Sequence, residues 1–330
     1  MTVAPTRSGA RSAGPLHQLL NQVRLRGEFY GEADLTAPWN LEMPAYAGAI
    51  SFHVVTQGHC VLVTADDERL LEAGDLALVP HGAGHQLLSG EVDIASEPVE
   101  MVPQIAVGPR HSRMTHGGGG EPARLICGVV SFDAPAAKEL ARRLPSIIHL
   151  QRRTLPAHAR VLESVRMMGE ELAEAAVGGD VLASRLADII VVQAIRTWLS
   201  EDPAAHQGWF VAVNDPDIGP ALVALHRDPG AAWTLSAMAQ QAAMSRSAFS
   251  ERFRQLMDET PMSYLTRWRM DVAATMLRDP STATWQVAHA VGYESEVSFA
   301  RAFHRVVGLT PAAWRRTLED EARRSVMALT

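Results

Sequence analysis

Two stretches near the end of the chain place serine and arginine side chains where they would share one face of a helix. Residues three and four positions apart lie on the same side of an α-helix. A guanidinium can donate two hydrogen bonds to O6 and N7 of a guanine, and a serine hydroxyl can contact a base or a phosphate. Such faces are typical of helices that lie in the major groove of DNA. The outward residues are Arg246, Ser247, Ser250, Glu251 and Arg254 in the first stretch and Glu296, Ser298, Arg301 and Arg305 in the second.

An internal repeat would position these two faces. Thr234–Pro261 reads TLSAMAQQAAMSRSAFSERFRQLMDETP, and Thr284–Pro311 reads TWQVAHAVGYESEVSFARAFHRVVGLTP. Each copy predicts a short helix, a tight turn and a longer helix. The spacing predicts two buried stripes on the longer helices, which are Phe249, Phe253 and Leu256 in the first copy and Phe299, Phe303 and Val306 in the second.

The residues around the second turn predict how its longer helix begins. Gly292 stands where the backbone would enter the left-handed region, and Ser295 is a candidate N-cap. Met262–Arg278 predicts one helix that spaces the two copies. Two recognition helices roughly 34 Å apart would lie in successive major grooves of DNA. The alternative is a plain helical bundle whose Ser/Arg faces contact solvent or another protein.

These residues also carry a family resemblance. Asp217 to about Thr317 resembles the DNA-binding domain of AraC/XylS-type transcription regulators, most specifically over VAHAVGYESEVSFARAFHRVVGLTPAAWRR, Val287–Arg316. The resemblance implies DNA contacts from the outward residues named above and from Ser295. Two residues depart from the family pattern. Ala243 stands where a turn glycine is common, which costs up to roughly 1 kcal/mol if its φ is positive. Glu251 would face phosphates unless it accepts a hydrogen bond from a cytosine N4.

The charge distribution is compatible with DNA binding, although the net charge of the chain is −7. From Asp217 onward there are 13 arginines, no lysine and 12 acidic residues, which leaves 17 basic and 25 acidic residues before it. The acidity therefore belongs to the front two-thirds of the chain. The arginines would need to gather on one face to attract phosphate.

The stretch from Leu16 to about Leu150 predicts a small β-barrel or sandwich, because short apolar runs alternate with Gly, Pro and Asp. Gly74–Ser89 reads GDLALVPHGAGHQLLS and resembles the second cupin motif. Leu16–Leu150 also resembles the cupin-type sensor domains found in front of some AraC-type activators. Between Glu91 and Pro122 the pattern fades, which predicts a long mobile loop.

Histidines and cysteines are the reactive side chains of this front part. His53, His81 and His85 are candidates for an effector pocket and, if a third ligand joins a His53–His85 pair, for a metal ion. No acidic ligand stands at the expected spacing, so hydrogen-bonded pocket histidines are the competing interpretation. Cys60 and Cys127 are candidate redox residues; a protonated His59 could lower the pKa of Cys60, whereas Cys127 lies in an apolar strand and fits simple packing.

The segment Ala157–Leu199 carries two amphipathic helical patterns, which would pack on the barrel or form a dimer interface. The expected organisation is a fold that combines β and α domains. A disordered tail would cover residues 1–15, a cupin-like sensor domain residues 16–150, a helical linker residues 151–216, a double helix-turn-helix domain residues 217–317 and a C-terminal tail residues 318–330.

The expected function is that of a cytoplasmic, homodimeric transcription regulator, more specifically an activator. Its expected partners are double-stranded DNA, a small-molecule effector and RNA polymerase. No apolar run of 18 residues or secretory leader occurs, so no membrane partner is expected. The rival interpretation is a metal-dependent cupin enzyme with a helical tail, which the missing carboxylate and the missing His-x-His pair disfavour.

Overall fold

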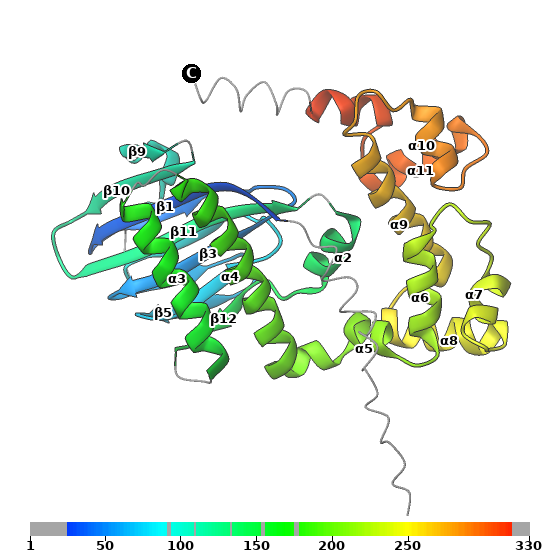
Figure 1. The fold of residues 1–330 in the computed structure, drawn as a ribbon, viewed down its shortest axis with the longest axis horizontal. Helices are drawn as coiled ribbons and strands as arrows, with labels where there is room; N and C mark the ends of the chain where they lie inside the picture. Colours follow the sequence, from blue (N-terminus) through cyan, green and yellow to red (C-terminus); the bar gives the residue numbers. More distant parts are fainter. Residues whose placement is uncertain are drawn as a thin grey trace, which may run out of the picture. The chain divides into compact units, whose positions relative to one another are not determined.

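The computed structural model describes residues 25–90, 94–108, 110–132, 134–152, 156–174 and 178–318. They form two compact units, one built mainly on the described residues between 25 and 205 and the other on those between 206 and 318. Figure 1 shows strands with packed helices in the first unit and helices alone in the second. The expected tails, 1–15 and 318–330, lie outside the described residues except for Leu318. None of the helices that the structure describes is long and apolar enough to cross a membrane.

The first unit contains two β-sheets. The larger has the order β12-β6-β3-β11-β1-β10-β9, and the smaller has the order β5-β4-β7-β2-β8. Strands β1 and β10 are parallel, and both β1 and β3 pair with β11 in antiparallel fashion. The strands are β1 Leu25–Thr36, β2 Asn40–Met43, β3 Ala49–Gln57, β4 His59–Val63, β5 Glu68–Glu72, β6 Leu76–Val79, β7 His85–Leu88, β8 Glu97–Pro98, β9 Gln104–Gly108, β10 His111–Gly117, β11 Pro122–Phe132 and β12 Ile148–Leu150.

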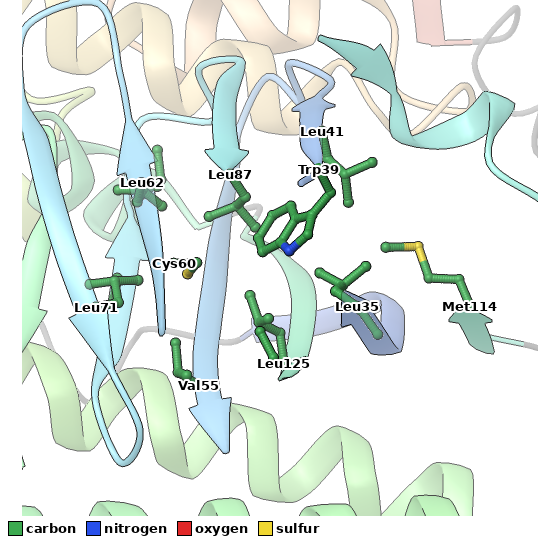
Figure 2. Packing of buried hydrophobic residues seen from close by; sticks show 14 of the residues in the cluster. Leu35, Trp39, Leu41, Val55, Cys60, Leu62, Leu71, Leu87, Met114 and Leu125 are labelled. Carbon is green, nitrogen blue, oxygen red and sulfur yellow. The ribbon is translucent and has the colours of Figure 1, made fainter. Parts of the chain in front are cut away.

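Both sheets contribute to one hydrophobic core. Trp39 lies between Leu35 of β1 and Leu87 of β7, and Leu62 and Leu125 belong to the same cluster (Figure 2). These side chains are almost completely buried. Buried and more exposed residues alternate along β4 and β7, whereas β6 and most of β3 are buried on both faces. The prediction of a β domain in front of a helical domain is confirmed.

The prediction of a long loop between Glu91 and Pro122 is wrong. This segment contains β8, the short 3-10 helix η1 (Val99–Met101), β9 and β10. Strand β10 pairs with β1 on one side and with β9 on the other. Its sequence, HSRMTHG, hides the alternation because Ser112 is buried although it is polar. Pairing with neighbouring strands, rather than local apolar character, forms these strands.

Three helices belong to the same unit as the sheets. They are α2 (Pro135–Arg143), α3 (Pro156–Glu174) and α4 (Gly179–Glu201), and the 3-10 helix η2 (Pro203–His206) follows. Helix α3 packs along α4, and α4 contacts β1, β11 and β12. The two amphipathic segments thus pack on each other and on the larger sheet. Some apolar side chains remain exposed on them, which are Met167 of α3 and Val181, Leu182 and Ile189 of α4.

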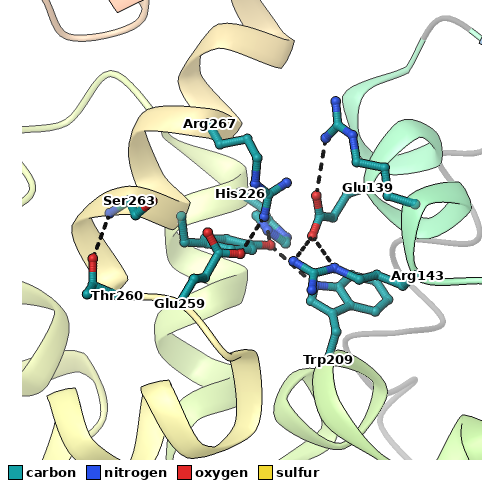
Figure 3. A network of polar contacts seen from close by, with 10 residues as sticks. Glu139, Arg143, Trp209, His226, Glu259, Thr260, Ser263 and Arg267 are labelled. Carbon is teal, nitrogen blue, oxygen red and sulfur yellow. Dashed lines mark hydrogen bonds and ion pairs between the residues drawn. The ribbon is translucent and has the colours of Figure 1, made fainter. Parts of the chain in front are cut away.

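The second unit consists of short helices around one longer helix, α9. The helices are α5 Gly208–Asn214, α6 Ile218–Arg227, α7 Leu235–Gln241, α8 Arg246–Met257, α9 Pro261–Met276, α10 Thr284–Ala290 and α11 Glu296–Val307. The repeated Thr-Pro pair marks helix starts. The hydroxyl of Thr260 accepts a hydrogen bond from the Ser263 amide, and Pro261 occupies the first turn of α9 (Figure 3).

A polar network is buried where α6 meets α9. Trp209 Nε1 donates to the Tyr264 hydroxyl at 3.3 Å, and His226 Nε2 lies 2.6 Å from the same oxygen (Figure 3). Burial, and secondarily the charge of Arg267, lowers the pKa of His226 to about 3, which keeps the ring neutral. The Tyr264 hydroxyl thereby joins Trp209 to an uncharged His226 ring. Helix α9 is thus tied to α5 and α6 by hydrogen bonds as well as by packing.

Candidate nucleic-acid interface and barrel cavity

Serine caps set the start of both recognition helices. The Ser245 hydroxyl accepts from the Ala248 amide at 3.2 Å, and the Ser295 hydroxyl accepts from the Ser298 amide at 3.4 Å. Helix α8 therefore begins at Arg246 and α11 at Glu296. The predicted N-cap at Ser295 is confirmed, and its hydroxyl is engaged in that cap.

Matched pairs of phenylalanine rings anchor the inner faces of these helices. The ring centroids of Phe249 and Phe253 are 5.6 Å apart, and those of Phe299 and Phe303 are also 5.6 Å apart. All four side chains are buried. The third inward residue was predicted one position too early. Met257 is buried and Val307 packs against the core, whereas Leu256 is only partly buried and Val306 is exposed.

The outer faces carry guanidinium groups that are open to solvent. Arg246 and Arg254 are exposed on α8, as are Arg301 and Arg305 on α11. Within the described part of the chain, none of these four side chains makes a hydrogen bond or an ion pair.

Other arginines of the unit have structural partners instead. Arg252 donates to Asp215 at 2.7 Å, and Arg269 donates to the carbonyls of Pro229 and Ala231. The two recognition helices therefore present cationic donors that the fold itself does not use.

The remaining predicted contact residues lie on the same faces. Ser247, Glu251, Glu296 and Ser298 are exposed, and Ser250 is partly exposed. Val297 was not predicted, although it is 61 % exposed on α11 between Glu296 and Ser298. Its position, two residues before Phe299, is out of phase with the buried stripe, and this spacing in the sequence indicates an exposed valine. A valine side chain there can make an apolar contact with a thymine methyl group.

The turn of each helix-turn-helix unit contains a residue with positive φ. Gly292 has a φ of 80°, as predicted, and a Cβ at this position would come within 2.8 Å of the Gly230 carbonyl oxygen. In the first copy Ala243 occupies the left-handed region with a φ of 51°. An alanine there costs roughly 1–2 kcal/mol relative to its right-handed conformation. The turn of the first helix-turn-helix copy therefore carries backbone strain that the turn of the second copy avoids.

The first compact unit, called the strand unit from here on, contains a partly open cavity of about 150 Å³. Most of its lining is apolar, with Ala33, Met43, Met114 and Val129 among the contributing residues. His53, His85 and Cys127 form part of its polar lining. Of the three predicted pocket histidines, His53 and His85 thus come together. His81 does not join them, because its Nε2 lies 2.9 Å from the Leu144 carbonyl oxygen.

The polar wall of the cavity is a chain of hydrogen bonds. His85 Nδ1 lies 3.1 Å from the Ala83 carbonyl oxygen, which can only accept, so Nδ1 carries the proton. Burial lowers the pKa of both His53 and His85, so both rings are neutral and His85 Nε2 is an acceptor. His53 Nε2 therefore donates to it across 2.7 Å. His53 Nδ1 is left to accept from the Cys127 thiol, whose sulfur is 3.1 Å away.

This arrangement does not suit a metal ion. All four ring nitrogens of the histidine pair already have hydrogen-bond partners. No group of three or more His, Cys, Asp or Glu residues that could hold a metal occurs in the described ranges. Both potential ligands would need to give up their contacts and a third would need to move, so the possible metal site at His53, His81 and His85 is not assembled.

Both cysteines lie where burial keeps the thiol protonated, unlike the activated thiol expected of a redox residue. Cys60 is fully buried in the apolar cluster of Figure 2, and burial raises the pKa of its thiol. His59 is exposed, because neighbouring residues of a strand point to opposite faces, so it cannot activate Cys60. Burial also raises the pKa of Cys127 to about 12. Both sulfurs are thiols rather than thiolates at neutral pH.

Comparison with known proteins agrees with this division of the chain. Residues 14–200 match the family model described as Cupin, and residues 238–317 match one described as Helix-turn-helix domain.

The chain is also similar along most of its length to regulatory proteins. It is 32% identical to an AraC-like transcription regulator from Streptomyces lividans over 92% of this chain and 98% of the relative. It is 27% identical to the HTH-type transcriptional regulator AlkR of Acinetobacter baylyi, over 91% of this chain and 98% of that one. It is also 27% identical to the RCS-specific HTH-type transcriptional activator RclR of Escherichia coli, over 87% and 92%.

Replacing the strained turn alanine tests the strain in the first helix-turn-helix copy. We expect Ala243→Gly to raise the free energy of unfolding of the helical unit by about 0.5–1 kcal/mol, because glycine adopts positive φ without a Cβ clash. The matched control is Ala242→Gly, where φ is −87° and glycine should destabilise instead. Urea unfolding with amide exchange in α8 as the local probe measures both. Equal losses of stability in the two variants would show that the turn is not strained.

Removing single guanidinium groups tests the DNA-facing assignment. Arg301→Ala and Arg305→Ala should each weaken binding to DNA selected from a random library by about tenfold, and each lost phosphate contact should reduce the salt slope by about one. The control is Arg69→Ala, which removes the same charge from an exposed arginine of the strand unit. Affinity titrations at two salt concentrations provide the measurement. Losses no larger than that of Arg69→Ala would favour a protein-interaction role for the helices.

Proposed function

The chain belongs to the AraC-like transcription regulators, and we propose that it activates transcription in response to a small molecule that binds in its strand unit. As a member of this family it is a DNA-binding regulator with a cupin domain, and its relatives are regulators rather than enzymes. The observation that supports the mode of DNA binding best is the set of four exposed arginines on α8 and α11 that lack partners among the described residues.

The cavity supports control by a small molecule. It lies among the strands of one compact unit, it is mostly apolar, and its lining includes a few polar groups such as His53, His85 and Cys127. These are general features of sites for small ligands. A ligand can change DNA affinity only by binding one of two states of the protein more tightly. The proposal therefore requires that filling the cavity alters the DNA-binding affinity of the chain.

Two further parts of the proposed function are contact with RNA polymerase and the formation of a homodimer. One relative is named a transcriptional activator, and an activator on DNA acts on RNA polymerase, which we propose as a partner in the cytoplasm. We further propose a homodimer formed through α3 and α4. The exposed side chains of Leu182 and Ile189 are seven residues apart on α4, so they share a face that a second copy would cover. We also propose domain limits of 16–150 for the sensor domain, 151–216 for the helical linker and 217–317 for the double helix-turn-helix domain.

A cavity-filling variant tests the coupling. Val129→Phe places a larger side chain in the cavity, and we expect it to change the affinity for the selected DNA by at least about fivefold, a typical lower bound for allosteric coupling. The control, Val63→Phe, adds the same bulk at a partly exposed position of β4 that does not line the cavity. Fluorescence titration of labelled DNA compares the two variants with the unmodified chain. If all three bind DNA equally well, the cavity does not control DNA binding.

A further inference from the structure

The charges around the cavity restrict what it can hold. Among the residues that line it, the charged ones are Glu32 and Glu100, and neither lysine nor arginine contributes to the described lining. Glu32 lies close to two partners, with Arg113 Nη2 3.1 Å from one carboxylate oxygen and His111 Nε2 3.1 Å from the other. Glu100 is exposed at the edge. Among the described residues, the wall of the cavity thus holds carboxylates but no lysine or arginine.

The histidine pair does not change this conclusion. Its four ring nitrogens are occupied by Cys127, by the partner ring and by the Ala83 carbonyl oxygen, so neither ring has an unused N–H to offer a ligand. An anion that entered would lose its hydration and would find carboxylates rather than a cationic partner. An uncharged apolar molecule would lose little hydration and would contact Ala33, Met114 and Val129.

The size of the cavity sets the scale of the ligand. A cavity of about 150 Å³ is comparable with engineered apolar cavities that accept one benzene molecule. We propose that the cavity binds a small, largely apolar molecule of about one aromatic ring that carries no negative charge. This inference rests on the proposed function, in which the cavity is the effector site, and it adds the chemical class of the effector.

Two probes of similar size and opposite charge character test the inference. Benzyl alcohol and benzoate both contain one ring, and only benzoate is an anion at pH 7. The full chain is labelled at its methionine methyl groups, and Met43 and Met114 report binding directly because they line the cavity. We expect millimolar benzyl alcohol to shift the Met43 and Met114 signals, and benzoate to bind at least about tenfold more weakly.

Variants confirm that the shifts arise in the cavity and that charge causes the discrimination. Val129→Phe should abolish the shifts that benzyl alcohol produces. Glu32→Gln leaves Arg113 without its carboxylate, so the preference for benzyl alcohol over benzoate should narrow severalfold. The control Glu68→Gln removes the same charge from an exposed residue of β5 and should leave the preference unchanged.

Two results would overturn the inference. One is benzoate binding as tightly as benzyl alcohol, and the other is the failure of benzyl alcohol to shift either methionine signal at millimolar concentration. Failure of the proposed function would appear elsewhere, as a DNA affinity that does not change in Val129→Phe. A cavity that binds benzyl alcohol but has no influence on DNA would therefore preserve this inference and reject the proposed function.

Discussion

The burial of two phenylalanine pairs against α9 is the interaction on which the DNA-binding unit depends. Phe299 and Phe303 share their core with Met270 and Ala273 of α9, and Phe253 contacts Tyr264 of the same helix. Each recognition helix is thereby oriented by its inner face, which leaves its arginines on the outside. Because one helix joins both cores, the separation of α8 and α11 is set by the length of a rigid element rather than by a flexible connection.

In the strand unit, buried polar groups in the wall of the cavity are paired with one another. Its sheets close over an apolar core, and one wall carries a hydrogen-bond chain from Cys127 through His53 and His85 to a backbone carbonyl. Because every member has a partner, the chain can be buried without a charge. Two histidines in a pocket would otherwise suggest a metal site or a positive charge. Here their ring nitrogens are all occupied by hydrogen bonds and both rings are neutral, so they offer neither.

Local patterns predicted those features that local physics determines. The repeat, the Ser295 cap, the positive φ of Gly292 and the buried phenylalanine pairs all follow from short-range spacing and were visible in the sequence. Features that depend on strand pairing were not visible. Strands β9 and β10 have weak alternation and exist because they pair with each other and β10 with β1. The separation of His81 from His53 likewise depends on a contact with Leu144, 63 residues away.

We propose that α9 holds the two recognition helices at one spacing, so that they occupy successive major grooves of DNA. The most direct test is to insert five base pairs between the two boxes of a selected DNA site, which rotates one box by about half a helical turn relative to the other. We expect the affinity to fall by at least about tenfold, to nearly that of a site with a single box. An unchanged affinity would contradict it, because the two helices would then be able to bind independently of their spacing.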